Sequence, residues 1–358
     1  MEWQVDNISS TNGLPADRSG REGTMTIQCS PVSDLVKYVM KPSPQALLRL
    51  INSHTNEYNK TTSTKPPMQW LITGCSSGFG LSLARAVLRH PNQHVIATSR
   101  NPSSSPEAVA EITSHSNGTW ATLDVSSPNL ESQLSTILDQ YGPIDVLINN
   151  AGFGVGGVLE DMPLDLMRSQ YETNFFGPMR LMKAVIPGMR QAGRGTIVNI
   201  SSSVFWDPHA SVSMYASSKW ALEGVSEALA EEVASFGIRV LIAQPGAMRT
   251  SFVDPEKVSK GLRPLPDAYK GTMADYVLQA IVGSHGVQSI DPEAAAGVVV
   301  EEVLRPSVMK DGEGKEVGRV LRLQLGKDCV GSMHAKMGKL ALEGGVVEEK
   351  ALSCNYET

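Results

Sequence analysis

The chain has no long hydrophobic run and no strongly basic region, and these two absences exclude large classes of protein. No apolar run approaches the roughly 18 residues that a membrane-spanning helix requires, so no transmembrane segment is predicted. The net charge is −6 and no basic stripe is present, which argues against a nucleic-acid partner. The N-terminal stretch MEWQVDNISSTNGLPADRSG also lacks the apolar core of a secretory signal.

Cysteine is scarce, and the few cysteines are scattered along the chain. The four are Cys29, Cys75, Cys329 and Cys354, and no two have the spacing of a metal site or a disulfide framework. A reduced intracellular compartment is the simplest interpretation of this usage, so a cytoplasmic protein is predicted.

The composition changes at Met68, which divides the chain into unequal parts. Residues 1–67 are rich in Ser, Thr, Asn and Pro, and we predict a flexible extension with one short amphipathic helix at roughly 33–52. Residues 68–325 are predicted to form a single folded domain, and 326–358 a C-terminal helix and tail. The chain has 358 residues, of which 41% are hydrophobic, so it can bury a sizeable core.

Short apolar runs recur after Met68 and alternate with helical stretches. The runs are MQWLIT, HVIAT, TWATL, IDVLI, TIVNI and IRVLIA, and their continuous hydrophobicity is typical of strands buried on both faces of a parallel sheet. LSLARAVLRH and PNLESQLSTILDQYG are two of the helical stretches between them. This alternation predicts a doubly wound (Rossmann) α/β fold with a mostly parallel sheet of about seven strands, the seventh near 317–325.

The first predicted strand runs directly into the loop TGCSSGFG, and a helix follows at once. Glycines in this position allow a tight turn and let a pyrophosphate approach the backbone, while the helix N-terminus supplies N–H groups and partial positive charge. The alternative is a strand-to-helix turn with a structural role alone. The predicted cofactor-binding residues of the loop are Gly74, Ser76, Ser77, Gly78, Phe79 and Gly80.

The end of the second predicted strand indicates which dinucleotide is bound. An acidic residue about 20 residues after the glycines would bind a ribose 2′-hydroxyl. Arg100 stands there instead, and its planar, charged side chain suits a 2′-phosphate. NADP(H) is therefore predicted over NAD(H), although Arg100 could instead be a solvated loop charge.

Three further loops carry small or polar residues at predicted strand ends. NNAG (149–152) follows the fourth strand, the serines 201–203 follow the fifth, and PGAMRT (245–250) follows the sixth. Because parallel strands end on the same edge of a sheet, these loops and the glycine loop should share one rim, where such folds bind ligands.

The stretch MYASSK places Tyr215 and Lys219 four residues apart, on one face of a predicted helix. A nearby cation lowers the pKa of a tyrosine from its usual value of about 10, which would make it a usable proton donor or acceptor. The same spacing also arises by chance on amphipathic helices. Ser202 lies upstream of this pair, on the rim of the predicted sheet.

Taken together, these motifs resemble those of the short-chain dehydrogenase/reductase family over residues 68–325. The sequence segments GFG, ATSRNP, NNAGFG and LGKD resemble those of its 17β-hydroxysteroid-dehydrogenase-like branch. This resemblance does not by itself identify a steroid substrate. Two residues depart from the common pattern, Cys75 and Phe79, and both are compatible with the loop. The matching positions are TGxxxGxG at 73–80, Asp124, NNAG at 149–152, Asn174, Ser202, YxxxK at 215–219 and the segment ending at Thr250.

The resemblance implies a catalytic set of Ser202, Tyr215, Lys219 and Asn174. Tyr215 would be the general acid, Lys219 would hold its pKa down and bind the nicotinamide ribose, and Ser202 would stabilise charge on the carbonyl oxygen. Asn174 would hold a water of a proton relay, in a helix that Gly177-Pro178 could kink. The alternative for Asn174 is a polar residue that faces solvent.

The resemblance also implies contacts with the cofactor beyond the glycine loop. Thr250 would contact the nicotinamide carboxamide, and Asp124 and Val125 would border the adenine, with a helix cap as the alternative role for Asp124. The remaining predicted cofactor residues are Asn150, Ala151, Gly152, Tyr215, Lys219, Pro245, Gly246 and Met248.

Substrate recognition is predicted from VFWDPHASVSM and from residues 251–290, of which the segment FVDPEKVSKGLRPLPDAYKGTMADYV (252–277) would form a mobile lid. Phe205, Trp206 and His209 would give the first segment a mostly apolar lining suited to a small hydrophobic carbonyl or alcohol, with packing or surface exposure the favoured role for His209. No metal site is expected. By resemblance, a homodimer or homotetramer is expected.

The predicted function is an NADP(H)-dependent oxidoreductase that interconverts a ketone or aldehyde and an alcohol by hydride transfer. A sugar-nucleotide epimerase or dehydratase would instead space its glycines as TGxxGxxG. A non-catalytic NADP(H)-binding sensor or scaffold would be expected to lose the Tyr, Lys or Ser, all of which are present.

Overall fold

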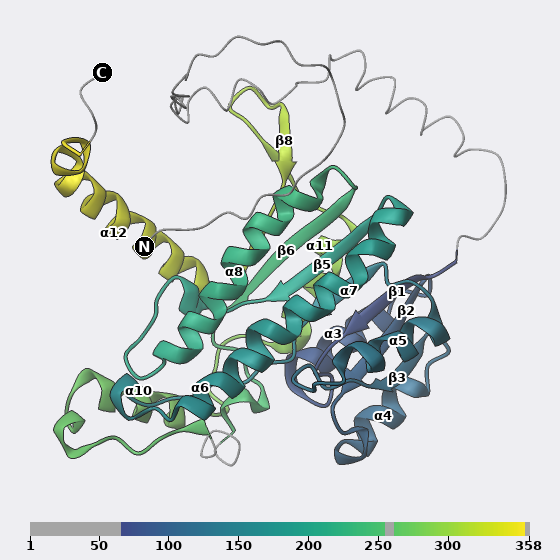
Figure 1. Cartoon of the computed structure of the whole chain (residues 1–358), viewed down its shortest axis with the longest axis horizontal. Helices are drawn as coiled ribbons and strands as arrows, with labels where there is room; N and C mark the ends of the chain where they lie inside the picture. Colours follow the sequence, from purple (N-terminus) through teal and green to yellow (C-terminus); the bar gives the residue numbers. More distant parts are fainter. Residues whose placement is uncertain (1–65, 255–260, 355–358) are drawn as a thin grey trace, which may run out of the picture. The chain divides into compact units, whose positions relative to one another are not determined.

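The computed structural model describes residues 66–254 and 261–354 (Figure 1). The predicted extension 1–67, apart from its last two residues, and the predicted helix at 33–52 lie outside the described residues.

A seven-stranded sheet organises the described part of the chain. Its order is β3-β2-β1-β4-β5-β6-β9, and every neighbouring pair is parallel. The predicted doubly wound, mostly parallel sheet of about seven strands is therefore confirmed. The strands are β1 (Met68–Ile72), β2 (Gln93–Ser99), β3 (Gly118–Thr122), β4 (Val146–Asn149), β5 (Gly195–Ile200), β6 (Ile238–Pro245) and β9 (Arg322–Leu325).

Helices cover both faces of this sheet, with one hydrophobic cluster on each face. The residues of β1 pack on both faces. Trp70 and Ile72 pack in the cluster that α3 and α11 cover, while Leu71 packs in the cluster that α5, α7 and α8 cover. Because both faces of the strand are buried, its sequence is continuously apolar. The helices are α3 (Gly78–Leu88), α4 (Pro106–Thr113), α5 (Leu130–Tyr141), α6 (Leu164–Tyr171), α7 (Gly177–Ala192), α8 (Ser213–Ala234), α10 (Met273–Gly283), α11 (Pro292–Leu304) and α12 (Lys327–Leu352).

The predicted seventh strand over 317–325 is correct only in its second half. Residues Glu316–Arg319 form β8, which pairs antiparallel with β7 (Val308–Lys310), and only β9 joins the main sheet beside β6. The run is interrupted at Val320 and Leu321, which lie between β8 and β9.

Along the chain the sheet grows from β1 toward β3 on one side and from β4 toward β9 on the other. The loops that follow β1 and β4 therefore lead to opposite sides of the boundary between these two strands. Doubly wound sheets bind ligands at such a switch point, outside the carboxyl ends of the strands. Across residues 66–254 and 261–354, none of the helices combines the length and apolar character that crossing a membrane requires.

Candidate active site

The glycine loop is shaped so that its backbone can approach a ligand closely. Gly74 and Gly78 have positive φ angles of 73° and 60°, and a Cβ at Gly80 would overlap both the Gly74 carbonyl oxygen and Asn150 Nδ2. α3 begins here with no side-chain cap at Ser77 and no acidic residue in its first turn. Its N-terminal N–H groups and positive dipole end are therefore suited to an anion. The other loop residues, Ser76 and Phe79, are half-buried.

Replacing Gly80 by alanine is expected to destabilise the fold by about 1–3 kcal/mol, because the new methyl group meets backbone that cannot move aside. Gly224→Ala is the matched control. Gly224 lies inside α8, and nothing lies within 4 Å of a Cβ built there, so the free energy of unfolding should increase by up to about 1 kcal/mol. Urea unfolding measures both changes, and equal stabilities for the two variants would contradict this account of the loop.

The NNAG loop is fastened to the end of β1. The Thr73 hydroxyl oxygen accepts hydrogen bonds from the backbone N–H groups of Asn150 and Ala151, at 3.0 and 2.9 Å. Asn150 Nδ2 donates to the Thr73 carbonyl oxygen at 2.8 Å. Gly152 follows, and a Cβ there would lie 3.6 Å from Lys219 Nζ. The loop therefore connects the glycine turn with the predicted catalytic lysine.

Asn174 is buried, so the alternative of a residue facing solvent is wrong. It lies in a π-helical turn (Glu172–Phe176) between α6 and α7, an irregularity of the kind that the sequence predicts near Gly177-Pro178. Its Oδ1 accepts from Phe153 N at 3.1 Å. Its Nδ2 donates to the Phe153 carbonyl oxygen at 2.9 Å and to Ser218 Oγ at 3.1 Å. Asn174 thus joins the NNAG loop to the helix that carries Tyr215 and Lys219.

Tyr215 lies in the first turn of α8, beside Ser202 at the end of β5. Burial raises the pKa of Tyr215 to about 12, and its hydrogen bond with Ser202 opposes that rise. The predicted lowering of this pKa is therefore wrong for the protein without cofactor. Lys219 Nζ lies 5.9 Å from the tyrosine ring centroid, and the cost of desolvating a phenolate outweighs its effect.

Lys219 is almost fully buried, 4% exposed, and its Nζ donates to the Ile200 carbonyl oxygen at 2.8 Å. Burial lowers the pKa of Lys219 to about 8, while the charge of Glu223 opposes the shift. The lysine is therefore held rigidly at the end of β5, one helical turn from Tyr215.

A buried polar cluster under Lys219 was not anticipated from the sequence. Glu223, one turn further along α8, accepts hydrogen bonds from Ser201 Oγ at 2.5 Å, Gln244 Nε2 at 2.7 Å and Arg322 Nε at 3.0 Å. Burial raises the pKa of Glu223, and these donors oppose the rise. The cluster ties the carboxyl ends of β5 and β6 and the first residue of β9 to α8. A signal was present in the spacing, because Glu223 follows Lys219 by four residues.

The segment after β6 contacts the glycine loop. A Cβ at Gly78 would lie 3.3 Å from Thr250 Cβ, and Met248 forms a bridge with Ile290. Asp328, at the start of α12, accepts from Ala247 N at 2.6 Å, beside Pro245 and Gly246. This contact fixes the turn after β6, and Asp328 is another residue that sequence reasoning missed.

The residues predicted at the adenosine end lie on the same rim, further along the sheet. Arg100 is exposed directly after β2, and within residues 66–254 and 261–354 no acidic side chain forms an ion pair with it. Asp124 Oδ1 accepts from Ser126 N at 3.0 Å and closes a turn well before α5 begins, so it does not cap that helix. Val125 is buried.

The predicted aromatic lining is only partly assembled. Phe205 packs on Trp206 and Trp220, with ring centroids 4.8 and 5.6 Å away. His209 is exposed, 3.8 Å from Asp207, in agreement with the surface role favoured for it. The aromatic ring beside Tyr215 is instead Phe252, at 5.8 Å between centroids. Phe252 lies within the predicted lid but was not singled out.

Comparison with known proteins agrees with this geometry. A profile described as short chain dehydrogenase matches residues 69–260. Oxidoreductase claN of Passalora fulva is 44% identical over 216 residues, which is 60% of this chain and 95% of that protein. The 3-ketodihydrosphingosine reductase of Bacteroides thetaiotaomicron is 42% identical over 197 residues, 54% of this chain and 69% of that protein. A crystal structure of a short-chain dehydrogenase from Streptomyces avermitilis aligns with a TM-score of 0.67 at 32% identity, over 81% of this chain and 99% of its own. The chain belongs to the short-chain dehydrogenase family and is an oxidoreductase of that family.

Proposed function

We propose that the protein is an NADP(H)-dependent oxidoreductase that interconverts a ketone or aldehyde with an alcohol on a hydrophobic small molecule. The observation that carries this proposal is the convergence of Ser202, Tyr215 and Lys219 at the carboxyl end of β5, with Asn174 joining them to the NNAG loop. These four side chains come from three separate elements, and their convergence at the strand ends supports a ligand site there.

The proposed chemistry assigns each side chain a step. In the reducing direction, Tyr215 donates its phenolic proton to the carbonyl oxygen of the substrate. Ser202 donates a hydrogen bond to the same oxygen and stabilises its developing negative charge. Lys219 favours the phenolate that remains and binds ribose hydroxyls, and by resemblance Asn174 holds a water that relays protons toward Lys219. When bound, the nicotinamide supplies the hydride.

The rim fits a dinucleotide on structural grounds. The uncapped N-terminus of α3 and the close-approach glycine at Gly80 suit a pyrophosphate. Asn150 to Gly152 and Pro245 to Thr250 flank the position proposed for the nicotinamide, and Asp124 and Val125 that for the adenine. Arg100 supports a 2′-phosphate, because it stands exposed where an acidic residue would favour NAD(H).

Replacing Arg100 by alanine is expected to lower the preference for NADPH over NADH by about 10- to 100-fold, because a charge-assisted hydrogen bond contributes about 1.5–3 kcal/mol. The measurement is the ratio of kcat/KM for the two cofactors. Arg305→Ala is the control, since the Arg305 side chain is 83% exposed directly after α11, where it forms an ion pair with Glu301 on the surface of that helix. An unchanged ratio in Arg100→Ala would make Arg100 a solvated loop charge.

The substrate class proposed is hydrophobic. Phe252 beside Tyr215 supports an apolar approach to the reacting oxygen. The 42% identical relative is named 3-ketodihydrosphingosine reductase, which supports a ketone as the substrate. We also propose that the protein belongs to the 17β-hydroxysteroid-dehydrogenase-like branch. A cytoplasmic location and a homodimeric or homotetrameric assembly are proposed as well.

The alternative is an NADP(H)-binding sensor without catalysis. Consumption of NADPH and NADH by the purified protein, across ketones, quinones and aldehydes, separates the two. Turnover with NADPH and little with NADH is the expected result. Measurable NADPH binding without turnover of any compound would favour the sensor.

A further inference from the structure

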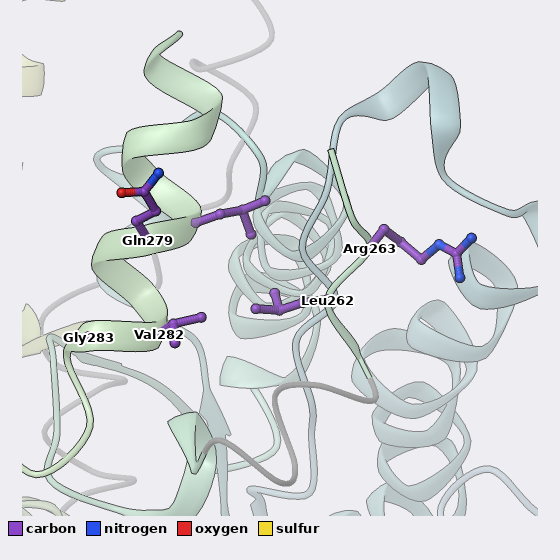
Figure 2. Close-up of a pocket in the computed structure, with 6 residues that line it drawn as sticks. Leu262, Arg263, Gln279, Val282 and Gly283 are labelled. Atoms are coloured by element: carbon purple, nitrogen blue, oxygen red, sulfur yellow. The ribbon is translucent and has the colours of Figure 1, made fainter. Parts of the chain in front are cut away.

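An open apolar groove lies between α10 and residues 262–263. Its volume is about 380 Å³, within the range of small-molecule sites. Figure 2 shows Leu262 and Val282 on opposite sides of the groove, with the Arg263 guanidinium directed away. The lining residues are Leu262, Arg263, Leu278, Gln279, Val282 and Gly283.

Two glycines link this groove to the catalytic tyrosine. A Cβ at Gly154 would lie 3.5 Å from Tyr215 Cδ2 and 3.4 Å from Phe252 Cζ. A Cβ at Gly156 would overlap Leu262 Cδ2 and lie 3.2 Å from Leu278 Cδ2. Gly156 forms a strand-like bridge with Leu262, and two residues of extended chain span roughly 7 Å. The short stretch from Gly154 to Gly156 therefore contacts Tyr215 at one end and the groove wall at the other.

The groove offers little to a polar or charged ligand. The amide of Gln279 is already engaged, because its Nε2 donates to Asp275 Oδ1 at 2.8 Å. The remaining walls are Leu262, Leu278, Val282, Gly283 and the Arg263 side chain, whose guanidinium is directed away from the groove (Figure 2). Leu278 to Val282 extend the apolar wall by roughly 6 Å, about one helical turn.

We propose that this groove binds the aliphatic chain of the substrate, whose carbonyl lies at Tyr215 and Ser202. The substrate class is then a long, unbranched aliphatic ketone or the corresponding alcohol. A compact substrate would lie at Phe252 without reaching Leu262. This inference rests on the proposed reductase function and specifies the substrate of the same site.

The test is the dependence of kcat/KM on chain length, measured with NADPH and a series of methyl ketones from butanone to tetradecanone. The shortest ketones should give similar values, because their chains end before Leu262. Once the chain enters the groove, kcat/KM should rise by about twofold to fourfold for each added methylene. A flat dependence on chain length in the unmodified protein would overturn the proposal.

Val282→Asp places a charge on the groove wall. Val282 is 48% exposed, so the substitution leaves the core intact, and Val298→Asp on α11 is a control with the same chemistry and the same 48% exposure. Val282→Asp should lower the ratio of kcat/KM for decanone to kcat/KM for butanone and so abolish the gain from long chains, while Val298→Asp should give the ratio of the unmodified protein. Retention of the gain in Val282→Asp would overturn the proposal.

A binding measurement separates failure of this inference from failure of the proposed function. If no ketone of any length is reduced, the reductase function fails. Calorimetric titration with decanol then measures binding in the groove without turnover. Binding to the unmodified protein that is lost in Val282→Asp supports the proposed aliphatic-chain site. No binding to the unmodified protein overturns that proposal.

Discussion

Tyr215→Phe is expected to lower kcat for ketone reduction by about 100- to 10,000-fold, the usual contribution of a positioned general acid. The substitution removes one oxygen atom and keeps the ring, so packing against Phe252 is preserved. NADPH affinity should change little, because the glycine loop, Arg100 and Lys219 are untouched. NADPH oxidation measures the first effect, and cofactor fluorescence measures the second.

Tyr141→Phe is the control, since Tyr141 is a half-buried tyrosine at the end of α5. It should leave turnover unchanged. The raised pKa of Tyr215, about 12 in the absence of cofactor, also sets a pH expectation. The phenol keeps its proton at neutral pH, so the loss in Tyr215→Phe should be present across the neutral range. Substantial turnover by Tyr215→Phe would assign the proton transfer to another group.

Much of the rim could be predicted because its signals are local in sequence. The glycine loop, NNAG and the serines each directly follow a continuous apolar run, and such runs identify strands buried on both faces. The direction of parallel strands then brings these loops to one edge. Tyr215 and Lys219 were predictable for a similar reason, because a spacing of four residues defines one face of a helix.

The remaining contacts of the site depend on residues far apart in sequence. Arg322 reaches Glu223 across 99 residues, and Asp328 reaches Ala247 across 81. No local pattern shows which arginine will meet which glutamate. The direction of the Tyr215 pKa shift was also missed, because it depends on the depth of burial, which spacing alone does not reveal.

Lys219→Met is expected to abolish activity and at the same time stabilise the fold near neutral pH. Burial lowers the pKa of Lys219 to about 8 from the usual 10.5, so the folded state holds this charge at a cost of roughly 3 kcal/mol at neutral pH. Loss of the hydrogen bond to Ile200 offsets about 1–2 kcal/mol of the gain. The expected net increase in the free energy of unfolding at pH 7 is about 1 kcal/mol.

The sign of the pH dependence distinguishes this cause from ordinary repacking. Between pH 8 and 10.5 the unfolded chain still holds the Lys219 proton while the folded protein has lost it, so the unfolded state binds more protons. Stability of the unmodified protein therefore rises with pH through this window relative to Lys219→Met, and the advantage of the variant shrinks and then disappears.

Urea unfolding at several pH values between 7 and 10 measures this difference. Lys183→Met is the control, because Lys183 is an exposed lysine of α7. The difference in the free energy of unfolding between this variant and the unmodified protein should not vary with pH in this way. An advantage of Lys219→Met that stays constant with pH would mean that packing, and not the buried charge, is responsible. A variant that is less stable at pH 7 would show that the contacts of the ammonium with Ile200 and the Glu223 cluster outweigh its desolvation. The expected result, with activity lost and stability gained, would identify Lys219 as a buried charge kept at the expense of stability, which is typical of groups that serve catalysis.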